Sequence, residues 1–144
     1  MHYLLDTDTV SYLIKRNSPH HPPVLKKLRS LSPSTVAISC ITVSELASGL
    51  HQISEQDNLH KKRIQEAFEY FVTAITILDY PFAAALMYGE LRARLKLKGT
   101  DIGAMDCLIA SHALAEKRIL VTNNAKHFSR IKELKLENWV ENSK

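Results

Sequence analysis

Tyr3-Leu4-Leu5-Asp6 is a short apolar run that ends at a carboxylate, and it predicts a strand. Directly after it, between Thr9 and Ile14, apolar residues recur at the spacing of a helix. The same alternation of a short apolar run with a longer helical pattern returns along the chain. Further strands are expected at residues 36–39, 75–78 and 119–121, with a fifth ending at 139–140.

Longer helical patterns separate these runs. Residues 17–23 form a Pro-rich loop, Thr42 is expected to cap a helix, and Asp79 with Pro81 opens another that stops at Gly99. The expected helices cover residues 9–14, 24–31, 42–53, a long amphipathic segment to about 71, 81–97, and 103–117, the last apolar nearly all round. Strands separated by helices pair in parallel through crossovers. We therefore expect one α/β domain over residues 1–144, with three α/β/α layers and a mostly parallel sheet of four to five strands.

The composition is that of an ordinary globular protein, with 45% hydrophobic and 24% charged residues. A net charge of +4 permits a polyanionic partner without demanding one. Cys40 and Cys107 each lie in an apolar run and are expected to be buried, reduced thiols. Asp6 and Asp8 interrupt the N-terminal apolar stretch, and no run is long enough to span a membrane. We expect a soluble, cytoplasmic protein with no membrane partner.

Four polar residues are placed where the predicted fold would bring them together. Asp6 ends the first strand, Glu45 lies early in the helix after the second, and Asn124 follows the fourth. Asp106 lies in the first turn of the apolar helix. Ligands of open parallel sheets bind beyond the carboxyl ends of the strands. Oxygen donors without Cys or clustered His suit a hard cation such as Mg²⁺ or Mn²⁺.

Each of these residues also has a purely structural interpretation. Asp6, taken alone, is best explained as a helix cap, and Asn124 as a turn residue. Glu45 completes the pattern Thr42-Val43-Ser44-Glu45, a capping box that explains it as well as catalysis does. Asp106 favours function, because its helical neighbours are apolar and offer its carboxylate no ion pair.

Four stretches of the chain resemble the motifs of PIN-domain nucleases, and the VapC toxin branch fits best. In chain order these are residues 1–9, which contain Asp6, residues 37–46 with Glu45, residues 99–110 with Asp106, and residues 120–124 with Asn124. Four motifs in the right order are a specific signal where one alone is weak. The resemblance covers almost the whole chain.

The resemblance implies a PIN fold, Mg²⁺-dependent endoribonuclease activity and inhibition by a cognate antitoxin. Asp6 and Asp106 would be the metal carboxylates and Glu45 the third acid. Asn124 stands where the wider family usually has Asp, which weakens the case for a second metal ion. A homodimer is implied as well. The branch includes enzymes that cut initiator tRNA, so tRNA is the expected substrate.

Arg92, Arg94, Lys96 and Lys98 end the helix just before the Asp106 segment. Cations are favourable at a helix C-terminus, and contact with an RNA backbone is a second role for Arg92, Arg94 and Lys98.

Two other functions stay open. Asp6-Thr7-Asp8-Thr9-Val10 after a strand matches the signature of haloacid-dehalogenase phosphatases, although no adjacent acidic pair occurs late in the chain. A PIN module that binds RNA or protein without catalysis is the other alternative, against which the three acids argue.

Overall fold

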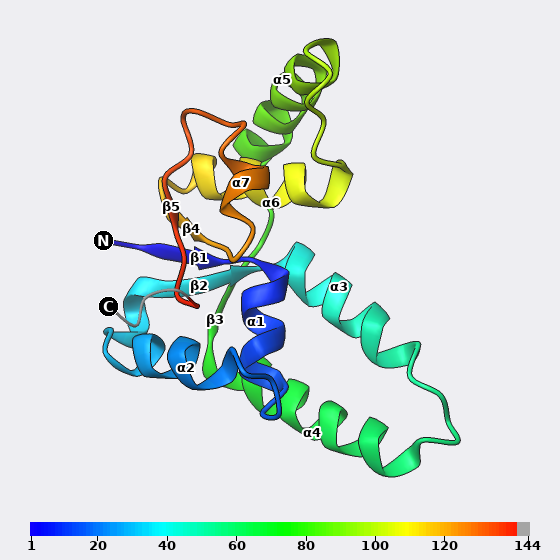
Figure 1. Cartoon of the computed structure of the whole chain (residues 1–144). Helices are drawn as coiled ribbons and strands as arrows, with labels where there is room; N and C mark the ends of the chain where they lie inside the picture. The colour runs from blue at the N-terminus through cyan, green and yellow to red at the C-terminus, as the bar shows by residue number, and fades with distance from the viewer. Residues whose placement is uncertain (141–144) are drawn as a thin grey trace.

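A five-stranded sheet lies at the centre of the computed structural model, which describes residues 1–140 (Figure 1). All strand pairs are parallel, in the order β3-β2-β1-β4-β5. The strands are β1 (Tyr3–Leu5), β2 (Val36–Ser39), β3 (Thr76–Leu78), β4 (Ile119–Val121) and β5 (Leu136–Glu137). The first four lie where the sequence predicts them. The fifth ends at Glu137 rather than at residues 139–140, because Trp139 leaves the sheet and packs edge-on against Tyr3.

Seven helices connect these strands within the described residues. They are α1 (Thr7–Ile14), α2 (His21–Arg29), α3 (Cys40–His51), α4 (Asn58–Ala74), α5 (Phe82–Leu97), α6 (Ala104–Ala115) and α7 (Ala125–Phe128), with a 3-10 turn η1 (Pro33–Thr35) before β2. The expectation that the Pro-rich loop extends to residue 23 is wrong. Helix α2 begins at His21 and takes Pro22 into its first turn, where a missing N–H costs no hydrogen bond.

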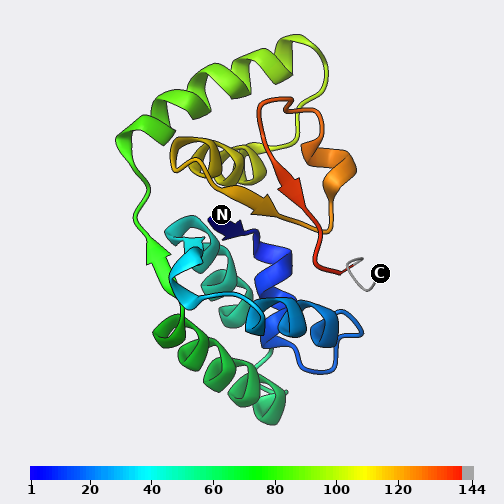
Figure 2. The same cartoon turned by 90° about the vertical axis from the view of Figure 1, so that its left-hand side faces the viewer.

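Two helical layers cover the two faces of the sheet. Alternate residues of each strand point to opposite faces, so Leu4 belongs to one hydrophobic cluster and Leu5 to the other. The Leu4 cluster packs the sheet against α5, α6 and α7, and the Leu5 cluster packs it against α1 to α4. Figures 1 and 2 show α5 to α7 on one side of the strands and α1 to α4 on the other. The three-layer α/β/α prediction is confirmed.

Helix α6 is the most deeply buried helix, as its apolar pattern predicts. Helix α5 covers it, and Gly99 and Gly103, both with positive φ, shape the turn between the two helices. His112 of α6 is fully buried, and its Nδ1 lies 2.8 Å from the Ser39 hydroxyl at the end of β2. This contact ties α6 to the sheet edge where the second motif begins.

Cys40 and Cys107 are both free thiols, as expected. Cys107 is buried, but the expectation that Cys40 is buried as well is wrong, because it lies at the start of α3 and is only partly covered. Among residues 1–140 there is no helix whose length and apolar character would let it cross a membrane.

Candidate active site: an acidic cluster at the carboxyl edge of the sheet

The sheet changes its winding direction between β1 and β4. From β1 the chain proceeds outward to β2 and β3, then returns to add β4 and β5 on the other side. Side chains that follow neighbouring strands at such a point meet in a crevice that no crossover helix covers. Asp6 follows β1 and Asn124 follows β4, so the fold brings the first and fourth motifs to this point.

Asp6 caps helix α1 and is buried at the same time. Its backbone N–H donates to the Val121 carbonyl at 3.0 Å, and its Oδ1 accepts the Thr9 N–H at 2.8 Å. Burial raises the pKa of Asp6 to about 6, although hydrogen bonds from Thr122 and Thr9 oppose this shift. None of the groups that shift this pKa is basic. Asp6 therefore does cap helix α1, but none of the groups that shift its pKa would compensate the charge of its carboxylate.

Asp8 belongs to the same cluster, although it was not predicted as a site residue. It is exposed in the first turn of α1, and its charge raises the pKa of both Asp6 and Asp106. Asp8 therefore lies close enough to each of these two carboxyl groups to disfavour its charged form.

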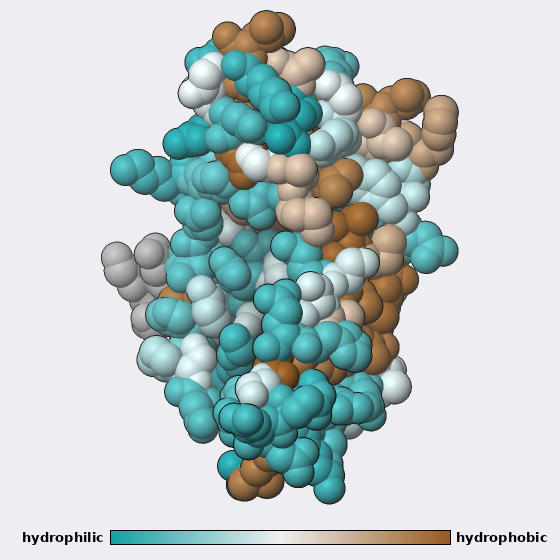
Figure 3. Space-filling model, turned by 90° about the vertical axis from the view of Figure 1, so that its right-hand side faces the viewer, coloured by the Kyte–Doolittle hydropathy of each residue, from teal (hydrophilic) through white to brown (hydrophobic). Residues whose placement is uncertain are grey.

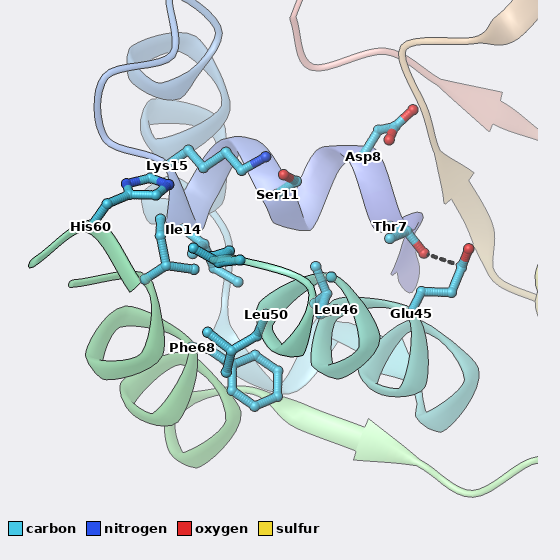
Figure 4. A pocket seen from close by; sticks show the side chains of 13 residues that line it. Thr7, Asp8, Ser11, Ile14, Lys15, Glu45, Leu46, Leu50, His60 and Phe68 are labelled. Carbon is cyan, nitrogen blue, oxygen red and sulfur yellow. Dashed lines mark hydrogen bonds between the residues drawn. The ribbon is translucent and has the colours of Figure 1, made fainter. Parts of the chain in front are cut away.

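Glu45 does not form the expected capping box. Helix α3 begins at Cys40, two residues before Thr42, and its cap is Ser39, whose hydroxyl accepts the Ile41 N–H at 3.0 Å. Thr42 is fully buried inside the helix. The Glu45 carboxylate instead accepts a hydrogen bond from the Thr7 hydroxyl at 2.5 Å (Figure 4). This bond joins the second motif to the first.

Asp106 lies half-buried in the first turn of α6. Burial raises its pKa, and His127, whose Nε2 lies 3.0 Å from Asp106 Oδ2, opposes this shift. The sequence predicted no basic neighbour along the helix, and there is none; the imidazole comes from α7. Asn124 begins α7 with an exposed side chain, and its backbone N–H donates to the Thr122 hydroxyl at 2.9 Å.

The donor set is that of a hard-cation site, since it contains carboxylate and amide oxygens and no thiolate. Asp6 adds a buried carboxylate without a basic neighbour, which a bound cation would neutralise. Within residues 1–140, however, no three His, Cys, Asp or Glu side chains stand close enough together to hold a metal ion as they lie. Two of the carboxylates already contact a protein group: Glu45 accepts a hydrogen bond from Thr7, and Asp106 Oδ2 lies 3.0 Å from His127 Nε2.

The PIN-domain family model matches residues 3–134 of the chain. Ribonuclease VapC2 of Rickettsia felis is 40% identical over 139 residues, which cover 96% of this chain and 98% of the relative. The tRNA(fMet)-specific endonuclease VapC of Salmonella typhimurium is 36% identical over 95% of this chain and 97% of its own. The chain belongs to the VapC family of PIN-domain proteins. Ribonucleases of this kind depend in general on a divalent metal ion.

Solved VapC-family structures share the fold. A chain of the Rickettsia felis VapBC2 complex bound to a promoter DNA fragment superposes with a TM-score of 0.81 at 39% identity, covering 96% of this chain and 99% of that one. A chain of DNA-bound VapBC from Salmonella typhimurium gives 0.82 at 34% identity, over 96% and 98%.

A groove leads away from the acidic cluster of this VapC-family chain. It has a volume of about 280 Å³ and lies between α1, α3 and α4. Thr7, Asp8 and Glu45 line one end, and Figure 4 shows Lys15 and His60 at the other. The apolar side chains of its wall are Ile14, Leu46, Leu50, Ile53, Ile64 and Phe68. An acidic end joined to an apolar wall suits a ligand that carries both a cation and apolar side chains.

Two of the basic residues of α5 form ion pairs that the sequence does not predict. The Arg92 Nε lies 3.1 Å from Asp101 Oδ1, and Arg92 also donates to the Tyr88 hydroxyl at 2.7 Å. Arg94 pairs with Glu133 at 2.7 Å. Lys98 is exposed at the end of the helix. The pairing with Glu133 spans 39 residues, so no local pattern could have revealed it.

The raised pKa of Asp6 predicts that its ionisation destabilises the fold. The folded carboxyl keeps its proton up to about pH 6, whereas the unfolded one loses it near 3.8. Its contribution to stability is therefore complete below pH 3.8 and is lost as the pH rises through 6. Asp6→Asn keeps a cap oxygen and cannot ionise. We expect it to gain free energy of unfolding over wild type between pH 4 and pH 8, by up to about 3 kcal/mol. Denaturant unfolding in EDTA measures this difference. Asp57→Asn, at the exposed start of α4, is the control, and curves that run parallel for Asp6→Asn and wild type would contradict the expectation.

Proposed function

We propose that this chain is the endoribonuclease toxin of a toxin–antitoxin pair and hydrolyses RNA phosphodiester bonds at the acidic cluster. The observation that supports this proposal is the position of Asp6 and Asn124 after β1 and β4, the neighbouring strands at the switch point, with Asp6 buried and no basic group among those that shift its pKa. The relatives are named ribonuclease or endonuclease VapC, which supports the same activity. The comparisons favour neither the phosphatase nor the silent module.

Mg²⁺ is the proposed metal and Mn²⁺ its substitute, held by Asp6 and Asp106 with Glu45 and Asn124 nearby. A bound ion of this kind neutralises charge on the phosphate and lowers the pKa of water. Glu45, fixed by Thr7, orients the attacking water and accepts its proton. The new bond joins the water oxygen to phosphorus, and the bond to the 3′ oxygen breaks. The products carry a 5′-phosphate and a 3′-hydroxyl.

RNA is proposed to approach along the basic end of α5. Lys98 is exposed, Arg94 is partly exposed, and Arg92 contributes charge while it remains paired with Asp101. A tRNA is the proposed substrate, because the Salmonella typhimurium relative is named a tRNA(fMet)-specific endonuclease.

The remaining proposals concern organisation. Both hydrophobic clusters use the same sheet, which supports one domain over residues 1–144. A cytoplasmic location is proposed because the RNA substrate is found there.

Glu45→Gln and Asp106→Asn should each lower RNA cleavage by roughly 10²–10⁴-fold, because they remove the proton acceptor and a proposed metal carboxylate. Antitoxin-free protein, incubated with total RNA in Mg²⁺ or EDTA, provides the measurement. Glu116→Gln, at the exposed end of α6, is the matched control and should cleave like wild type. Cleavage that persists in EDTA would count against a metal enzyme, and phosphate release from small esters with intact RNA would favour the phosphatase.

The cognate antitoxin is proposed to occupy the groove between α1, α3 and α4. Several structural neighbours are VapBC toxin–antitoxin complexes. A segment that covered the apolar wall of this groove would end at Glu45 and Asp8, where a cationic side chain would block the acids. Inhibition then needs no change in the fold of the toxin.

Gly49→Arg tests this groove. Gly49 lines it, and a Cβ added there would meet no atom within 4 Å, so the new side chain enters the groove without straining α3. We expect at least a tenfold loss of affinity, about 1.4 kcal/mol, for the small antitoxin that co-purifies with wild type. Gly89→Arg is the control, since Gly89 lies in an equally open position on α5. Calorimetric titration compares them, and wild-type affinity for Gly49→Arg would place the antitoxin elsewhere.

A homodimer is proposed through the exposed apolar side of α5. Phe82 and Leu86, one turn apart, are 77% and 64% exposed. Figure 3 shows apolar surface gathered in a band along one side of the molecule. Exposed apolar patches of this kind are typical of interfaces.

Phe82→Glu combined with Leu86→Glu should convert the dimer into a monomer, because two carboxylates would be buried against their symmetry mates. Sedimentation of the antitoxin-free protein at micromolar concentration measures the mass. Leu59→Glu, an exposed apolar residue of α4, is the control and should leave the mass unchanged. A monomeric wild type would refute the proposal.

A further inference from the structure

Helix α7 contributes a second polar group to the acidic cluster besides Asn124. His127 lies three residues after Asn124, so this one short helix carries both. Its Nε2 is 2.9 Å from the Ile102 carbonyl oxygen and 3.0 Å from Asp106 Oδ2. Both partners lie at the start of α6, in the third motif.

The Ile102 carbonyl fixes which nitrogen of the ring carries hydrogen. A carbonyl oxygen only accepts hydrogen bonds, so Nε2 must be the protonated nitrogen. Asp106 Oδ2 lies 3.0 Å from the same nitrogen, on the side of the ring that carries the hydrogen. Phe128, 1% exposed and edge-on to the His127 ring at 5.6 Å, anchors α7 in the core. The imidazole is therefore set in place before any ligand arrives.

The contact leaves Asp106 with one occupied and one unoccupied oxygen. Oδ2 is bound by His127, and among the described residues no protein donor reaches Oδ1. An unsupported carboxylate in the first turn of a helix would sample several rotamers. With Oδ2 held, Oδ1 points consistently in one direction.

We propose that His127 is a positioning residue that orients the Asp106 carboxylate for the metal ion. The inference rests on the proposed function, and it adds a residue that none of the four motifs contains. Groups that hydrogen-bond to metal carboxylates fix their orientation and raise metal affinity. Because both side chains are partly exposed, the same contact would contribute little to stability.

Two amide variants separate orientation from simple polarity. His127→Gln places its amide nitrogen near the position of Nε2, whereas the amide of His127→Asn is too short to reach Asp106. We expect His127→Asn to weaken Mn²⁺ binding to the antitoxin-free protein by about 10–100-fold, and His127→Gln to bind close to wild type. Calorimetric titration with MnCl₂ measures this independently of catalysis. His60→Asn, on α4, is the control.

A second measurement distinguishes positioning from a general structural effect. In an Asp106→Asn background, His127→Asn should cause no further loss of Mn²⁺ affinity, because the carboxylate that it orients is gone. An equal loss in both backgrounds, or wild-type Mn²⁺ affinity for His127→Asn, would overturn the inference while RNA cleavage by wild type leaves the proposed function standing. A wild type that neither binds Mn²⁺ nor cleaves RNA would overturn both.

Discussion

The hydrogen bond from the Asp6 N–H to the Val121 carbonyl fixes the point on which the rest of the structure depends. It extends the β1–β4 pairing by one residue and turns the chain from β1 into α1. The Asp6 carboxylate is then buried at the carboxyl edge of the sheet, where it caps α1 and loses most of its hydration. The capping role of Asp6 is therefore compatible with the proposed catalytic one.

Strong periodicity made the fold predictable. Four strands and the buried helix α6 lie where apolar spacing places them, because a parallel sheet covered on both faces needs continuous apolar runs. The helix starts were less predictable: Ser39 caps α3 in place of Thr42, and α2 takes two prolines into its first turn. A capping pattern such as Thr42 to Glu45 indicates only which local hydrogen bonds are possible. Tertiary contacts decided otherwise, since Thr42 faces the core and Glu45 faces Thr7.

The candidate site, like the fold, could be predicted from the sequence only in part. The motifs predicted Asp6, Glu45, Asp106 and Asn124 as site residues. The topology explains why Asp6, Glu45 and Asn124 come after β1, β2 and β4, whereas Asp106 lies in the first turn of α6. The groups that contact these side chains were missed, because Thr7 lies 38 residues from Glu45 and His127 contacts Asp106 from a separate helix. The ion pairs of Arg92 and Arg94 were missed as well, because their acidic partners lie outside helix α5. The type of a residue indicates the chemistry that it can perform. Whether it already forms a hydrogen bond or an ion pair depends on partners that come close only in the folded chain.

The pairing of β1 with β4 also affects the order of events during synthesis. Thr9 bonds to the Val121 carbonyl, 112 residues further along the chain. A nascent chain therefore cannot enclose Asp6 until β4 has left the ribosome, by which time both other acids have already emerged. Such long-range parallel pairing is slow to form. The crevice therefore takes shape only after most of the chain has been synthesised, when the strands on both of its sides are present.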